Sequence, residues 1–201
     1  MSVYAAPVEV CNAALAEMGD DQIVALTDGS PAAITLNTRY EPLVKKELTK
    51  HGYSWAKKVA RLVYQGETGN APTYAYYLPN DVLTPRWLMV GHAPVVRGYQ
   101  LSSNKLLVDV KYDYDLHYTW RVPESQWPAD FADAMVKRLH SVLLRALPVD
   151  YVTARERDQA ADFDFSAARI RDRMANGKQP NYSPDPVLVQ AWRGASPHAQ
   201  A

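Results

Sequence analysis

Carboxylates are the side chains of this sequence whose types and spacing come closest to a reactive site. Asp109, Asp113 and Asp115 fall in a segment that alternates like a strand, and three carboxylates on one strand face could gather a hard cation. The neighbouring residues lack the glycine and the glutamate of a calcium-binding loop. A solvated sheet face is therefore the preferred interpretation, and a hydrolase with a carboxylate site around Asp109 and Asp113 stays as an alternative.

Aromatic residues in the middle of the chain could form a surface on which sugars or bases stack. They are Tyr74, Tyr76, Tyr77, Tyr112, Tyr114, Tyr118 and Trp120. Aromatic residues in strands more often serve as core residues and cross-strand partners, so burial is the prediction. The alternative function is a carbohydrate- or nucleic-acid-binding β module that uses these tyrosines, which would require exposed, coplanar rings.

The remaining reactive residue types form no arrangement that indicates catalysis or metal binding. Cys11 is the only cysteine, so no internal disulfide or thiolate metal cage can form, and we expect it to be a small core residue. Residues 66–70 lack the lysine of a phosphate-binding loop and indicate a turn. The histidines are too scattered for metal ligation on a helix: His51, His92, His117, His140 and His198. We expect no enzyme activity, no metal and no cofactor.

Composition narrows the class of protein further. With 201 residues, 47% of them apolar and 22% charged, the chain can bury a normal core. Its 22 basic and 22 acidic residues leave no net charge, whereas a dedicated nucleic-acid binder carries a basic surplus. No apolar run approaches the ~18 residues of a membrane span, and the N-terminus does not resemble a signal peptide. We expect a cytosolic protein without membrane contact.

Helical periodicity marks both ends of the chain. Pro7 suits a first helical position, Gly19 a left-handed stop, and Ser30 with Pro31 a second helix start. Pro128 precedes a third apolar stripe, which ends before Pro148. The predicted helices span residues 7–18, 31–51, 129–147 and 150–175.

The middle of the chain has the period of strands. Its clearest segment is 106–114, where apolar and charged residues alternate, so one face should be buried and the other wet. The predicted fold class is α+β: a helical bundle of N- and C-terminal helices, with an antiparallel sheet or sandwich inserted at about 56–120. Residues 1–177 are expected to form one domain, and the proline-rich residues 178–201 an extended C-terminal tail.

The last predicted helix has a thin apolar stripe and many charges of both signs. The stripe comprises Tyr151, Ala154, Ala161, Phe165 and Ala168. A helix this polar is poorly secured by one core, which indicates that it bridges solvent or binds another subunit. The tail that follows is proline-rich but contains apolar residues between 187 and 192, which would suit docking on a partner.

Three aromatic motifs stand at the joins between the predicted elements: Tyr-Ser-Trp-Ala at 53–56, Tyr-Tyr-Leu-Pro-Asn-Asp-Val-Leu at 76–83, and Trp-Pro-Ala-Asp-Phe at 127–131. In this order, together with the first helix at 10–19 and the acidic, aromatic strand at 108–114, they resemble the head-to-tail adaptor proteins of tailed bacteriophages. That group includes tail tubular protein A of short-tailed phages. The resemblance covers about residues 8–147.

The resemblance implies a structural virion protein made in the cytoplasm of a bacterial host. Twelve copies would form a ring beneath the portal protein, extend the DNA channel and receive the next tail component, a nozzle or tail protein. DNA would pass through without specific binding. For the ring, the inter-subunit contacts are predicted at Arg155, Arg157, Asp158, Asp162, Arg169 and Arg171. Docking to portal or tail is predicted at Pro180, Tyr182, Val187, Leu188, Val189 and Trp192.

Overall fold

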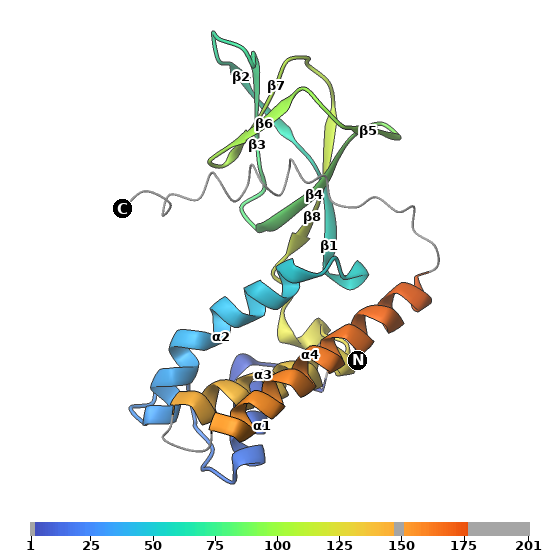
Figure 1. Ribbon diagram of the computed structural model, residues 1–201. Helices are drawn as coiled ribbons and strands as arrows, with labels where there is room; N and C mark the ends of the chain where they lie inside the picture. The colour runs from blue at the N-terminus through green and yellow to red at the C-terminus, as the bar shows by residue number, and fades with distance from the viewer. Residues whose placement is uncertain (1–2, 147–150, 177–201) are drawn as a thin grey trace. The chain divides into compact units, whose positions relative to one another are not determined.

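Helices occupy both ends of the described chain and strands occupy its middle (Figure 1). The structure is a computed structural model that describes residues 3–146 and 151–176. It confirms the predicted α+β class with antiparallel sheets. The contacts divide the chain into two compact units. A helical unit comprises the residues up to Glu47 together with Val122–Ala175, and a β unit contains Leu48–Arg121.

The four helices begin and end where local chemistry predicts. They are α1 (Pro7–Met18), α2 (Pro31–Lys50), α3 (Ala129–Ala146) and α4 (Tyr151–Ala175). Gly19 ends α1 in the left-handed conformation, with a φ of 73°. The Oγ of Ser30 accepts a hydrogen bond from the backbone N–H of Ala33 over 3.1 Å and so caps α2. Among the described residues, no helix is both long and apolar enough to cross a bilayer.

The core of the helical unit forms around the third aromatic motif. Trp127 and Phe131 are fully buried, with ring centroids 5.0 Å apart and planes at 84°. The indole N–H of Trp127 donates to the carbonyl of Val122 over 3.0 Å, which satisfies the buried polar atom. From this start, α3 packs against α1 and against α4. Cys11 of α1 is buried as predicted, and burial raises the pKa of its thiol to about 12.

The β unit is built from two antiparallel sheets of four strands each. The first has the order β1-β8-β4-β5 and the second β2-β3-β7-β6. The strands are β1 (Lys57–Arg61), β2 (Val63–Glu67), β3 (Tyr74–Tyr77), β4 (Val82–Val90), β5 (Ala93–Val95), β6 (Tyr99–Ser102), β7 (Lys105–Val108) and β8 (Tyr114–Trp120). Leu62 alone separates β1 from β2, so the chain passes from one sheet directly into the other. Leucines and tyrosines from both sheets form one shared core.

The predicted strand at 106–114 is wrong in one respect, because the structure divides it. Strand β7 ends at Val108 in the second sheet, and β8 begins at Tyr114 in the first. Between the two strands, the hydroxyls of two buried tyrosines hydrogen-bond to backbone carbonyls. The hydroxyl of Tyr76 donates to the carbonyl of Tyr112 over 2.8 Å, and that of Tyr114 donates to the carbonyl of Val110 over 2.7 Å. Side-chain hydrogen bonds thus replace the backbone hydrogen bonds between strands where the chain passes from one sheet to the other.

Arg86 of β4 is a buried arginine that binds the last residues of α2. Its guanidinium donates to the hydroxyl of Thr119 over 2.7 Å and to the carbonyls of His51 and Thr49 over 3.0 and 3.3 Å. Helix carbonyls at a C-terminus lack partners within the helix, so a cation there is favourable. Burial lowers the pKa of Arg86.

Replacing Arg86 by alanine should lower the free energy of unfolding by about 2 kcal/mol, because buried acceptors lose hydrogen bonds from a charged donor. Urea unfolding followed by circular dichroism would measure it. Arg97, an exposed arginine of the same unit, provides the control, and its replacement by alanine should change stability by less than about 0.5 kcal/mol. Equal effects of the two substitutions would contradict this role of Arg86.

Candidate functional site

Helix α4 is held on α3 by a narrow row of small side chains with one aromatic ring. Ala154, Ala161, Phe165 and Ala168 are buried, as the predicted stripe requires. The ring of Phe165 meets that of Phe131 at a centroid distance of 5.4 Å and an angle of 62°. Alanine side chains let two helices approach closely, and Phe165 fills the remaining space. The apolar seam is therefore narrow but continuous along α4.

An ion-pair cluster reinforces this seam, with Arg138 of α3 at its centre. Arg138 is 7% exposed, and its guanidinium binds the carboxylates of Asp158 and Asp162, the latter over 2.6 Å. Glu47 lies 3.6 Å away, and Arg145 also binds Asp158, over 2.6 Å. Buried charges are tolerated when several opposite charges surround them. The cluster therefore fixes which face of α4 turns inward.

The pKa values follow from this arrangement. Burial by itself would lower the pKa of Arg138, but the nearby carboxylates of Asp162, Glu47 and Asp158 outweigh it and raise the pKa. Burial opposes the ionisation of Asp158, yet hydrogen bonds from Arg145 and Arg138 hold the pKa of Asp158 below its usual value. Both partners stay charged at neutral pH, so the pairs persist there.

The predicted inter-subunit residues fall into three groups. Asp158 and Asp162 bind Arg138, and Arg171 binds Asp130 over 2.5 Å, so these three contact their own chain. Arg169 is half-buried. Arg155 and Arg157 are exposed, and within the described residues neither forms an ion pair. These two arginines are the predicted contact residues that remain available to a partner.

Three large apolar side chains on the outer face of α4 were missed by the sequence analysis. Phe163 is 74% exposed, Ile170 50% and Met174 77%. Their separations of seven and four residues place them on one side of a helix, opposite the buried alanines. This spacing is visible in the sequence, but the surrounding charges obscure it. An exposed apolar stripe of this kind is typical of a protein-protein contact.

The predicted docking residues in the tail lie outside the described residues. They are Pro180, Tyr182, Val187, Leu188, Val189 and Trp192. The same holds for the predicted extended tail at 178–201 and for the side chain of Tyr151.

Two of the three carboxylates considered for a cation site, Asp113 and Asp115, bind an arginine instead. Arg61 binds Asp115 over 2.7 Å and Asp113 over 3.4 Å. The hydrogen bond from Arg61 holds the pKa of Asp115 below its usual value. Within residues 3–146 and 151–176, no group of three histidine, cysteine or acidic side chains is arranged to hold a metal ion.

Most of the strand tyrosines belong to the core of the β unit, as predicted. Tyr76, Tyr114 and Tyr118 are buried, and the rings of Tyr76 and Tyr114 meet edge to face at 81°. Burial and a hydrogen bond to Asp81 raise the pKa of Tyr118 to about 12. Tyr77 and Tyr112 are exposed. Rings at steep angles to one another do not form a flat platform for sugars or bases.

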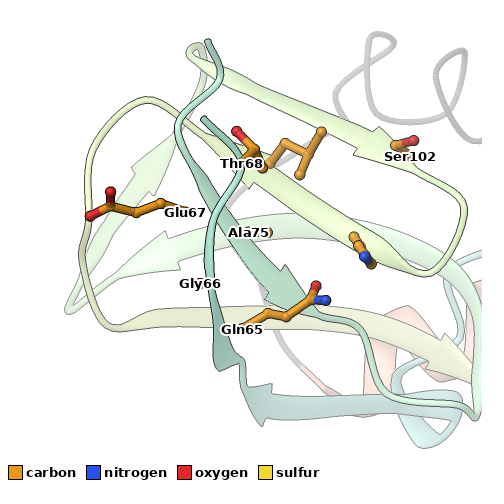
Figure 2. A pocket seen from close by; sticks show the side chains of 8 residues that line it. Gln65, Gly66, Glu67, Thr68, Ala75 and Ser102 are labelled. Carbon is orange, nitrogen blue, oxygen red and sulfur yellow. The ribbon is translucent and has the colours of Figure 1, made fainter. Parts of the chain in front are cut away.

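A depression of about 390 Å³ lies on the second sheet beside β2 (Figure 2). Its lining residues are Gln65, Gly66, Glu67, Thr68, Ala75, Ser102, Lys105 and Leu107. The hydroxyl of Thr68 is occupied, because it donates to backbone carbonyls of its own turn, among them that of Pro72 over 2.6 Å. Figure 2 shows Glu67 pointing away from Gln65 and Ser102.

Comparison with protein-family models and with curated proteins found no match to this chain.

Proposed function

We propose that this protein is a structural component of a tailed-bacteriophage virion, a head-to-tail adaptor that forms a ring between the portal and the tail. The observation that carries the proposal is the order of the elements together with the place of the three aromatic motifs. Two helices lead to a β segment and a third helix follows it, which is the order the resemblance implies.

Each motif stands at a join between elements, where it would be needed to fix the fold. Tyr53 and Trp55 lie at the entry to β1, with ring centroids 5.2 Å apart. Residues 79–81 connect β3 to β4, and the side chain of Asp81 binds Lys58 over 2.7 Å. Trp127 packs on Phe131 at the start of α3. The residues of the motifs therefore make contacts that stabilise the fold of this chain. This supports a comparison of its fold and role with those of the adaptor proteins.

In this role the chain binds the portal protein on one side and the next tail component on the other. A ring of twelve copies extends the channel through which DNA passes. A channel wall that gripped phosphates strongly would slow the DNA, and the absence of net charge suits a wall that does not. A closed ring requires that one face of each subunit meets a different face of its neighbour.

Electron microscopy of virions labelled with an antibody against this chain tests the proposal. The label should lie at the single vertex where head meets tail, at the site that an antibody against the portal protein also marks. Label on the capsid shell or on the tail fibres, or virions that lack the chain, would overturn the proposal. An antibody against the major capsid protein serves as the control, because it must decorate the whole head.

A further inference from the structure

Two surfaces of the helical unit combine exposed apolar side chains with charge. The first, here called the α4 surface, consists of Phe163, Ile170 and Met174 with Arg173 beside them. Arg173 is exposed, directly precedes Met174 and follows Ile170 by three residues, so it lies close to both on α4. It forms no ion pair with another described residue. The α4 surface is therefore apolar between Phe163 and Met174 and positive at its C-terminal end.

The second surface, here called the α1–α2 surface, lies in the segment that connects the first two helices. It consists of Asp20, Asp21 and Val24. Val24 is 90% exposed. The first basic residue of the chain is Arg39, so residues 1–38 contain five acidic side chains and no lysine or arginine. The α1–α2 surface is therefore apolar at Val24 and negative at the neighbouring Asp20 and Asp21.

The connecting segment is held in place although it contains no regular structure. The side-chain amide of Asn12 donates to the carbonyl of Ile23 over 3.0 Å and accepts from its N–H over 2.9 Å. The carboxylate of Asp28 accepts from the N–H groups of Val24 and Ala25 over 2.8 and 3.1 Å. Val24 is thus presented to solvent by a fixed backbone. A surface that is already ordered loses little entropy when it binds.

The two surfaces belong to one compact unit but to different elements of it. Helix α3 packs against α4 and against α1, and Asn12 of α1 holds the connecting segment through Ile23. Asp158 and Asp162 of α4 are bound by Arg138 and Arg145 of α3. Arg173 of α4 and the negative connecting segment are left to meet partners on other molecules.

We propose that the α4 surface of one copy docks on the α1–α2 surface of the next copy. The partner is a second copy of this chain because the same unit supplies both the positive, apolar surface and the negative, apolar surface that complements it. Two different faces in contact make a heterologous interface, which closes into a ring when the rotation between copies is suitable. The inference rests on the proposed function only where it identifies this ring with the ring between portal and tail.

The two kinds of side chain have different tasks in this contact. Phe163, Met174 and Val24 supply most of the affinity, since large apolar side chains at the centre of an interface dominate binding. Arg173 opposite Asp20 and Asp21 supplies orientation, because opposite charges steer the encounter and like charges oppose a wrong one. Reversing the charge of one surface should therefore weaken the contact, and reversing both should restore it.

Disulfide trapping between two cysteine variants of the full-length chain tests the contact directly. One variant carries Val24→Cys and the other Ile170→Cys. The natural cysteine does not interfere, because Cys11 is buried and the pKa of its thiol is raised to about 12. Mixing the two variants should yield the mixed dimer in clear excess over either self-dimer. Val59→Cys, at an exposed position of the β unit, gives the background of random collision.

The charge test uses the same trapping reaction. Adding Arg173→Glu to the Ile170→Cys variant should lower the yield of mixed dimer about tenfold. Adding Asp20→Lys and Asp21→Lys to its Val24→Cys partner should then restore most of the yield. A yield of mixed dimer no greater than the Val59→Cys background overturns the proposal, as does an excess of Ile170→Cys self-dimer. Charge reversals that act equally whether one surface or both are changed overturn it as well.

The outcomes separate this contact from the proposed function. If the antibody label lies at the head-tail vertex and trapping fails, the adaptor role stands and this interface is wrong. If trapping succeeds and the label lies elsewhere, the chain associates through these two surfaces in another assembly.

Discussion

Replacing Arg138 by methionine should lower the free energy of unfolding of the helical unit by about 3 kcal/mol. Methionine keeps much of the volume but leaves Glu47, Asp158 and Asp162 close together without the cation between them. Breaking a buried pair costs about 3–5 kcal/mol when the remaining charge is uncompensated. We expect the lower end because Arg145 still binds Asp158 and because Asp162 is partly exposed.

Urea unfolding monitored by helical circular dichroism would measure this loss, and its dependence on pH would identify the cause. The pKa of Asp158 is depressed in the folded chain, so its stabilisation is present above the unfolded value of about 4 and disappears as the pH falls through the folded value. The difference between the wild type and Arg138→Met should therefore be full at pH 7 and shrink below about pH 4.

Arg155 offers a matched control for the same measurement. It is an arginine of the same unit, but its side chain is exposed and forms no ion pair with another described residue. Replacing it by methionine should change the free energy of unfolding by less than about 0.5 kcal/mol. A similar loss for Arg138 and Arg155, or a loss for Arg138 that is independent of pH, would mean that the cluster does not hold α4 on α3.

The ion-pair cluster also explains why charge pattern alone could not assign the faces of α4. In sequence, Arg155, Asp158 and Asp162 are equivalent members of a mixed run. Two of them, Asp158 and Asp162, are paired only because Arg138 and Arg145 project from α3 to meet them. That pairing joins residues far apart in the chain, and no local rule contains it. The surface of α4 that is available for contact becomes clear only once it is known that Asp158 and Asp162 are bound by arginines of α3.

Element boundaries were the most predictable feature, because each depends on neighbours in sequence. Pro7 and Gly19 delimit α1 through backbone conformation alone, and Ser30 caps α2 within its first turn. The segment at 106–114 could not be divided in advance, since its alternation is that of a continuous strand. Its interruption depends on Tyr76, a residue of another strand, whose hydroxyl binds the carbonyl of Tyr112. Local signals thus place elements, and distant partners decide their continuity.

Replacement by alanine should change stability strongly at one of the two phenylalanines of α4 and hardly at all at the other. Phe165 is 1% exposed between α3 and α4 and contacts Phe131, so Phe165→Ala should lower the free energy of unfolding by about 3–5 kcal/mol through lost contacts and a cavity. Phe163 lies two residues away on the outer face, and Phe163→Ala should change stability by less than about 0.5 kcal/mol. Each variant is the control for the other, because helix, residue type and substitution are the same.

Assembly should show the reverse order in the disulfide trapping reaction. At a temperature where both variants are folded, Phe163→Ala should lower the yield of mixed dimer severalfold, because an aromatic side chain at the centre of a contact supplies much of its affinity. Phe165→Ala should leave that yield close to the wild-type value, since its side chain lies on the inward face. Equal destabilisation by the two variants would contradict the orientation of α4. An unchanged yield with Phe163→Ala would remove the outer face of α4 from the contact, whatever its effect on stability.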